Sequence, residues 1–179
     1  MKWVLITALV LVSIVFASVF SACTNGPMQD LRERFVNGFI ATHNSMADAE
    51  KLLPQAGDAA TGGQYALAVE KMTEAKADAY QAFISNPTGV VAEMQKQNAG
   101  VSEGKVLDLL SARITSFMDG AEHFLKAMSY AQQGDVSGHN QEVDLGNTAF
   151  DKSWQSEYAL QDLVRTDANL SYLRQAVGW

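Results

Sequence analysis

The sequence predicts an all-α protein, an up-and-down antiparallel four-helix bundle that follows an N-terminal hydrophobic signal or anchor helix. Three observations lead to this fold class. An uncharged apolar run occupies residues 3–22, four later segments repeat apolar residues at helical spacing, and alanine is abundant whereas only three prolines occur. Short links join the first segment to the second and the third to the fourth, which favours antiparallel neighbours.

The apolar run separates an N-terminal region, residues 1–23, from a bundle domain, residues 24–179. At about 1.5 Å per residue, a helix of about 20 residues is about 30 Å long, which matches the hydrocarbon core of a bilayer. A short positive start at Met1 and Lys2, followed by an apolar run, is typical of an export signal. We therefore expect a protein of the cell membrane with the bundle on the extracytoplasmic side.

The end of the run, Phe20-Ser21-Ala22-Cys23, resembles the lipobox of bacterial and some archaeal lipoproteins, a family that prefers Leu at the position of Phe20. The resemblance implies cleavage before Cys23 and lipidation of its thiol. Two other fates are open. The run exceeds the roughly 7 to 15 apolar residues of an ordinary signal peptide, which favours an uncleaved anchor, and simple secretion is the third fate.

The first bundle helix is predicted to begin at Pro27, because the first helical position does not need a backbone N–H. Pro54 and Gly57 are expected to end it. Since Pro27 follows Cys23 closely, we expect the anchor to hold the bundle near the membrane. The predicted buried face repeats apolar or small residues at steps of three and four: Leu31, Phe35, Phe39, Thr42, Met46, Ala49 and Leu53.

The second helix is predicted to open at the capping-box pattern of residues 61–64, a threonine with a glutamine three positions later. Asn86 is expected to cap a short helix that carries Val91 and Met94, and residues 95–100 are predicted to form a polar loop. The predicted buried stripe of the second helix consists of Tyr65, Val69, Met72, Ala75, Ala79 and Phe83.

The third helix has the most regular pattern, and we expect Ser102 to cap it and Gly134 to end it. Its steps of three and four are typical of helices that pack at about 20° in bundles. The residues of this stripe are Leu107, Leu110, Ile114, Phe117, Ala121, Phe124, Met128 and Ala131.

A tight turn at Gly134 and Asp135 is predicted to lead into the fourth helix. Thr166 and Asp167 then form a new cap before a short final helix that carries Leu170 and Leu173. The predicted apolar side of the fourth helix consists of Val143, Phe150, Trp154, Tyr158, Leu160 and Val164.

Charge and cysteine content exclude several classes of function. The chain has 13 Lys and Arg against 20 Asp and Glu, a net charge of −7, which disfavours nucleic acid and anionic lipid headgroups. With no cysteine beyond Cys23, the bundle has no disulfide and no thiolate metal site. Because Lys2 precedes the apolar run whereas Arg32 and Arg34 follow it, the positive-inside rule does not decide the orientation, and a cytoplasmic bundle is the alternative.

The histidines offer only weak metal candidates. Glu122 stands next to His123, so the Glu-x-x-His motif of di-iron bundles is absent. Asp119 and His123 are spaced i,i+4 and can face one metal ion, with His43 as a third ligand from the first helix. A place for His123 at the boundary of the core is the favoured interpretation. We expect no metal and no cofactor, since the haem attachment motif CxxCH is also missing.

Catalysis has little support in the sequence, and we expect no catalytic residues and no enzyme. The chain lacks a Gly-x-Ser-x-Gly elbow and a phosphate-binding glycine loop. Ser137, His139 and Glu142 lie close together, but such residues are ordinary at a helix start. Asn169 begins a glycosylation sequon, a short pattern that often occurs by chance. Four aromatic residues near the C-terminus can fill the core or form an exposed binding patch: Trp154, Tyr158, Tyr172 and Trp179.

The favoured function is that of a membrane-anchored, non-enzymatic helical bundle that binds or scaffolds a protein partner in the cell envelope. A ligand-binding or metal-binding bundle, as in extracytoplasmic sensors, is the first alternative. A tetratricopeptide-like module of helical hairpins is the second, because similar helix starts at Gly63 and Gly134 are separated by about two 34-residue repeats.

Overall fold

The computed structural model describes residues 26–179, and every regular element in that range is a helix, which confirms the all-α prediction. No helix in this range is both long enough and apolar enough to cross a membrane. The predictions for residues 3–22 and for Cys23 fall outside the described residues. The elements are α2 (Pro27–Thr61), α3 (Tyr65–Ser85), α4 (Thr88–Lys96), α5 (Val101–Gln133), α6 (Val136–Thr166), the 3-10 helix η1 (Ala168–Leu170) and α7 (Ser171–Val177).

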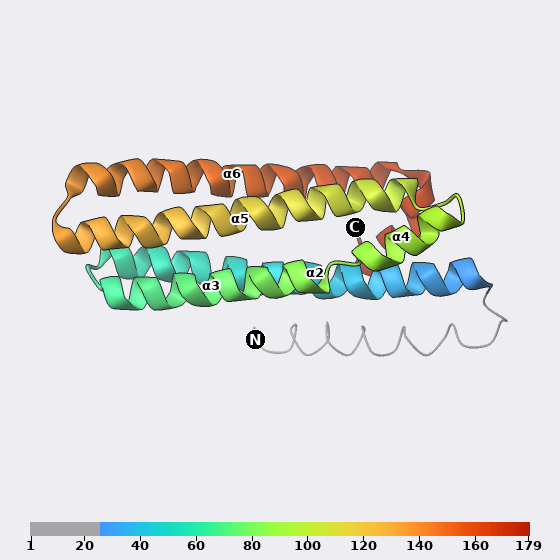
Figure 1. Cartoon of the computed structure of the whole chain (residues 1–179), viewed down its shortest axis with the longest axis horizontal. Coiled ribbons are helices and arrows are strands. Elements are labelled where there is room, and N and C mark those ends of the chain that lie inside the picture. Colours follow the sequence, from blue (N-terminus) through green and yellow to red (C-terminus); the bar gives the residue numbers. More distant parts are fainter. Residues whose placement is uncertain (1–25) are drawn as a thin grey trace, which may run out of the picture. The chain divides into compact units, whose positions relative to one another are not determined.

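Residues Leu31–Trp179 form one compact unit. Within it, α2 and α3 lie side by side and run in opposite directions, and α5 and α6 do the same (Figure 1). The short helix α4 connects the two pairs, and α7 follows α6 at the same end of the unit. One hydrophobic cluster joins α2, α3 and α5 through residues such as Met46, Met72 and Phe117.

Helix α2 buries the predicted face from Leu31 to Ala49, but the prediction that Pro54 and Gly57 end the helix is wrong. The helix continues to Thr61 and buries two more alanines, Ala56 and Ala59. Pro54 lies on the exposed side, where its ring displaces no core residue. Its missing N–H removes one bond from the helical ladder, and the packing of the last two turns offsets that loss.

In α3, Met72, Ala75 and Ala79 are buried as predicted, but the start of the helix and the rest of its buried face differ from the prediction. Thr61 belongs to α2, where its hydroxyl donates to the carbonyl of Gly57 at 2.9 Å, and Gln64 makes no side-chain cap. Phe83 is exposed, whereas small residues fill the contact with the other helices. Alanine allows the helix axes to approach closely, which leaves no room for the larger side chains. The buried residues are Ala68, Met72, Ala75, Ala79 and Ala82.

Helix α5 buries most of its predicted stripe and ends as expected, because Gly134 adopts φ 74°, a left-handed conformation that glycine reaches without strain. The predicted cap at Ser102 is wrong. Gly100 occupies the N-cap position, and the buried hydroxyl of Ser102 donates to Asp167 Oδ2 at 2.7 Å. That bond ties the start of α5 to the end of α6.

Helix α6 begins at the predicted turn, where the Asp135 side chain accepts from the N–H of Gly138. Its buried face is rotated from the predicted one, because Trp154 and Tyr158 are exposed whereas the neighbouring Ser153 and Glu157 are buried. The short final helix is present. As expected, the carboxylate of Asp167 caps the turn that leads into it, accepting from the N–H of Asn169.

Two glycines bring α5 and α6 close together. A Cβ at Gly120 would lie 2.7 Å from the ring of Phe150, and a Cβ at Gly146 would lie 3.4 Å from the carbonyl oxygen of Gly120. Real Cβ atoms almost never approach another atom as closely as 2.7 Å, so a side chain at Gly120 would force Phe150 to shift, whereas a Cβ at Gly146 would lie only at ordinary contact distance. Phe150 in turn packs edge-on against Phe117, with ring centroids 5.4 Å apart.

Candidate functional site

A cluster of charged side chains lies buried between the packed helices, although the prediction placed no charged residue on a buried face. Arg113 of α5 is 2% exposed and reaches carboxylates on two other helices. Its Nη2 lies 2.6 Å and its Nε 3.2 Å from Oε1 of Glu50 on α2. Its Nη1 lies 2.6 Å from Oε2 of Glu157 on α6. Three helices therefore meet at one buried guanidinium.

The backbone and neighbouring side chains hold this cluster in place. The Ser153 hydroxyl donates to the carbonyl of Arg113 at 3.0 Å, and the Gln161 amide donates to Oε1 of Glu157 at 2.8 Å. Oε2 of Glu157 accepts no well-directed hydrogen bond despite its short distance to Nη1, so charge attraction holds it. Burial raises the pKa of Glu50, and the Arg113 guanidinium opposes that rise only in part.

His43 completes the cluster and is covered by aromatic rings. Nη1 of Arg113 lies 3.3 Å from His43 Nδ1, and because a guanidinium can only donate, Nδ1 is the acceptor. The neutral ring therefore carries its proton on Nε2. The ring of Trp179 packs edge-on against His43 and Phe39, with centroids 5.4 Å and 5.8 Å away. Burial lowers the pKa of His43, and Arg113 adds to that effect against an opposing contribution from Glu157.

Sequence reasoning missed this cluster, although its signal is present in the printed sequence. Arg113 falls on the buried stripe of α5, three residues after Leu110, and Glu157 falls on that of α6, three residues before Leu160. A single charged residue on an apolar stripe is unusual. One buried cation on one helix and carboxylates on two others predict a mutual ion pair.

The weak metal candidates do not come together. His43 belongs to the Arg113 cluster, whereas His123 Nδ1 lies 2.6 Å from Oε2 of Glu142 on α6. Asp119 is exposed on α5. Within residues 26–179, no group of three or more His, Asp or Glu side chains is arranged to hold a metal ion.

The serine, histidine and glutamate at the start of α6 also have separate partners. His139 Nδ1 lies 3.0 Å from the carbonyl oxygen of Ala127, and Glu142 is paired with His123. Ser137 is exposed. No charge relay therefore connects Ser137 to Glu142 through His139.

The four C-terminal aromatic residues divide into two groups. Tyr158, 67% exposed, and Trp154 lie on the outer face of α6 and border a shallow hollow with Asp151 and Gln155. Tyr172 instead donates its hydroxyl to Oε1 of Glu103 at 2.7 Å, and Trp179 covers His43. Burial and the Glu103 bond raise the pKa of Tyr172, so it remains a phenol. The four aromatic residues therefore form no single exposed patch.

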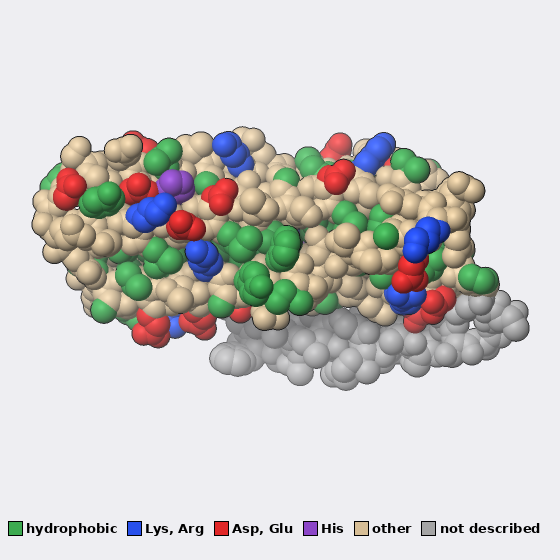
Figure 2. Space-filling model, viewed as in Figure 1, with side chains coloured by type: hydrophobic (Ala, Val, Ile, Leu, Met, Phe, Trp, Pro, Cys, Tyr) green, Lys and Arg blue, Asp and Glu red, His purple; other side chains and the backbone are tan. Residues whose placement is uncertain are grey.

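The largest exposed apolar side chains of α3 lie together near its C-terminal end. Tyr80 is 55% exposed, Phe83 51% and Ile84 59%. The rings of Tyr80 and Phe83 stack with centroids 6.5 Å apart. Figure 2 shows hydrophobic side chains gathered midway along the visible face, over α3 and α5. We call Tyr80, Phe83 and Ile84 the α3 patch.

The sequon residue Asn169 is exposed in η1, and its backbone N–H is bound by Asp167. The lipidation candidate Cys23 is outside the described residues. In comparisons with known proteins, no family model matches the chain, and neither a curated protein nor a solved structure matches it.

Proposed function

We propose that this protein is a membrane-anchored, non-enzymatic, extracytoplasmic four-helix bundle that binds a protein partner of the cell envelope through the α3 patch. The observation that carries the proposal is the exposure of Tyr80, Phe83 and Ile84, each more than half accessible to solvent. Clustered apolar side chains of this size on a solvent-exposed surface mark interaction sites. Aromatic rings supply much of the binding energy in protein interfaces.

The position of the patch suits an interface. The contacts of α3 with the other helices use alanine and Met72, so the patch residues lie outside the packing of the bundle. Stacking of Tyr80 on Phe83 holds two rings in one orientation before a partner arrives. A surface that is ordered in advance loses less conformational entropy on binding.

An up-and-down antiparallel bundle is the architecture that best fits the helix lengths. Helices α2, α5 and α6 have 35, 33 and 31 residues, so each is about as long as a whole tetratricopeptide repeat. Repeats of that kind contain two helices each. The long helices therefore favour the bundle over the tetratricopeptide-like module.

A non-enzymatic role is supported by the partners of the polar side chains. The buried Arg113 is ion-paired with both Glu50 and Glu157, and His123 and His139 each contact a different group. Catalytic sites instead bring an acid, a base or a nucleophile to a cleft that a substrate can enter.

Attachment to the membrane is assigned to residues 1–23, on the strength of their apolar run and lipobox-like end. The net charge of −7 repels anionic headgroups, so the bundle itself does not attract such a surface. A partner anchored in or exposed at the same membrane would meet the patch at a high effective concentration.

Photo-crosslinking of the full chain in its native membranes tests the proposal. A benzophenone amino acid replaces Phe83, and we expect one discrete crosslinked product of higher mass. The matched control places the same amino acid at Tyr158, an aromatic residue of similar exposure on α6. Phe83→Asp, which changes an exposed side chain and leaves the core intact, should release the partner from a pull-down.

Two results would contradict the proposal. One is the absence of any crosslink from position 83, and the other is the same products from both positions. Retention of the partner by Phe83→Asp would likewise show that the α3 patch does not bind it.

A further inference from the structure

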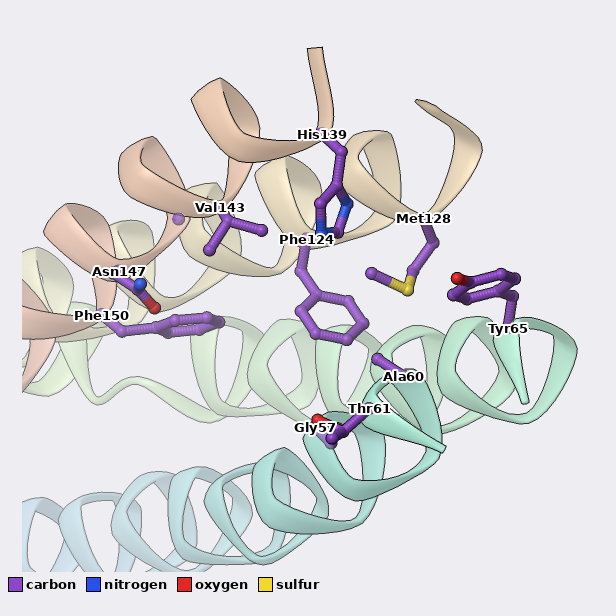
Figure 3. A pocket seen from close by; sticks show the side chains of 11 residues that line it. Gly57, Ala60, Thr61, Tyr65, Phe124, Met128, His139, Val143, Asn147 and Phe150 are labelled. Carbon is purple, nitrogen blue, oxygen red and sulfur yellow. The ribbon is translucent and has the colours of Figure 1, made fainter. Parts of the chain in front are cut away.

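A second surface feature, separate from the α3 patch, is a pocket between the helix pairs near the α2–α3 turn. Its volume is about 320 Å³, close to the lower limit for small-molecule sites. Figure 3 shows the side chains around it. The lining includes no Asp, Glu, Lys or Arg. The lining residues are Gly57, Ala60, Thr61, Tyr65, Phe124, Met128, His139, Val143, Gly146, Asn147 and Phe150.

The pocket exists because small residues face large ones. Gly57 on α2 has no atom within 4 Å of the place where a Cβ would lie, so the space beside it is open. Phe124 lies above Gly57, and Tyr65 lies beside Met128 at one side of the pocket (Figure 3). The walls therefore offer aromatic faces and a thioether, which suit an aromatic ring in edge or offset contact.

The imidazole of His139 adds a hydrogen-bond acceptor to a lining whose other polar side chains are Thr61, Tyr65 and Asn147. The His139 ring projects toward Phe124 (Figure 3). Its Nδ1 lies 3.0 Å from the carbonyl oxygen of Ala127, and because a carbonyl can only accept, Nδ1 carries the proton of the neutral ring. Nε2 is then an acceptor, and no residue within 26–179 is hydrogen-bonded to it.

We propose that this pocket binds a small neutral phenol, with its ring between the aromatic walls and its hydroxyl donating to Nε2 of His139. The volume admits a single substituted ring. The absence of charged lining residues favours a neutral ligand over an ion, because an unpaired charge is costly to desolvate. The aromatic walls favour a ring over a flexible chain.

Two probes that differ by one hydroxyl test the proposal on the full chain in detergent: 4-methylphenol and toluene. Binding is followed by two-dimensional amide NMR and by calorimetry. We expect 4-methylphenol to shift the amides around Phe124 and Val143, and toluene to bind about fivefold more weakly, the ratio expected from one neutral hydrogen bond.

Three variants assign the site. Gly57→Leu places a side chain in the pocket, so the variant should lose binding of both probes. It should still fold, because leucine has a higher helix propensity than glycine. Gly89→Leu is the matched control, because Gly89 also faces open space but lies on α4, and it should bind both probes as the wild type does. His139→Leu should bind 4-methylphenol no better than toluene.

Other outcomes would overturn the proposal. Absence of 4-methylphenol binding by the wild type is one, and unchanged binding by Gly57→Leu is another. Equal binding of the two probes by the wild type would leave Nε2 of His139 without the assigned role. The circular dichroism spectrum of each variant establishes that a loss of binding does not reflect unfolding.

Discussion

Two arginine–glutamate pairs of the molecule differ in surroundings more than in geometry. Arg34 on α2 and Glu93 on α4 form a two-pronged pair at 2.8 Å and 3.1 Å, with side chains 45% and 47% exposed. Arg113 meets Glu50 at 2.6 Å and 3.2 Å, but its side chain is almost fully buried. The Arg34 hydrogen bond lowers the pKa of Glu93, whereas burial raises that of Glu50.

The difference shows that distance alone does not measure the worth of an ion pair. At the surface, water and salt screen the attraction and solvate either partner once the other is removed. Between the packed helices, removal of one partner leaves a charge that water cannot reach. Removal of one partner of the buried pair should therefore lower the free energy of unfolding far more than removal of one partner of the surface pair.

The largest effect is expected from Arg113→Leu. This variant leaves Glu50 and Glu157 facing each other without a cation, and we expect a loss of about 3–5 kcal/mol in the free energy of unfolding at neutral pH. Urea unfolding followed by circular dichroism measures it. A control with leucine at all three positions removes the unpaired charges and should lie within about 2 kcal/mol of the wild type. Equal losses in both variants would assign the effect to packing instead.

The next effect is a dependence on pH carried by His43. Since burial lowers its pKa below the ordinary 6.5, the unfolded chain takes up a proton at a higher pH than the folded chain does. The free energy of unfolding should therefore fall as the pH falls from the pKa of His43 in the unfolded chain to its lower pKa in the folded chain. Below the folded-state pKa it should level off. Protonation would also cost the hydrogen bond from Arg113 to Nδ1.

The measurement compares urea midpoints of the wild type and His43→Gln between about pH 7.5 and pH 5.5. Glutamine keeps an acceptor for Arg113 but does not titrate. Glu50, with its raised pKa, contributes a slope of the opposite sign in both proteins, so the difference between them isolates His43. Parallel curves for the two proteins would refute the role of His43.

Ser153→Ala tests the support of the buried cluster. The variant removes the bond from the Ser153 hydroxyl to the Arg113 carbonyl and should cost about 0.5–1.5 kcal/mol. Ser156→Ala on the same helix is the control, because the Ser156 hydroxyl bonds within its own helix at the surface. Equal costs in thermal unfolding would mean that burial at Ser153 adds nothing.

The smallest effect is expected at the surface. Glu93→Gln removes the charge that faces Arg34, and we expect a urea midpoint close to that of the wild type, with the difference vanishing in concentrated salt. Glu50→Gln is the matched change at the buried site and should respond far less to salt. A large decrease in the urea midpoint of Glu93→Gln that persists in concentrated salt would contradict the expected difference between the two pairs.

Local signals predicted the helices well where each signal acts within a few residues. Gly134 ends α5 because only a left-handed residue closes that turn, and Asp135 caps α6 with its own side chain. Pro54 misled the prediction because a proline ends a helix only when no packing supports the next turn. Packing by Ala56 and Ala59 was not visible from the local sequence.

The charged cluster could be predicted only in part, because Arg113 lies on the regular stripe of α5 whereas its partners come from distant parts of the chain. Hydrophobicity assigned Trp154 and Tyr158 to the core of α6, yet the helix is rotated so that Glu157 reaches Arg113. The rotation also brings Ser153 to the Arg113 carbonyl and lets Gly146 approach α5. Contacts between helices, not the apolar content of one helix, set its orientation.

The buried face of α3 consists of alanine apart from Met72. Each alanine brings a single methyl group into the core, so separation of α3 exposes less apolar surface than separation of α5, which buries Leu110, Ile114 and Phe117. Segments held by little apolar surface open first in native-state hydrogen exchange. Amides of α3 should therefore exchange before those of α5, and the helix that carries the exposed patch is the one that a bound partner can protect most.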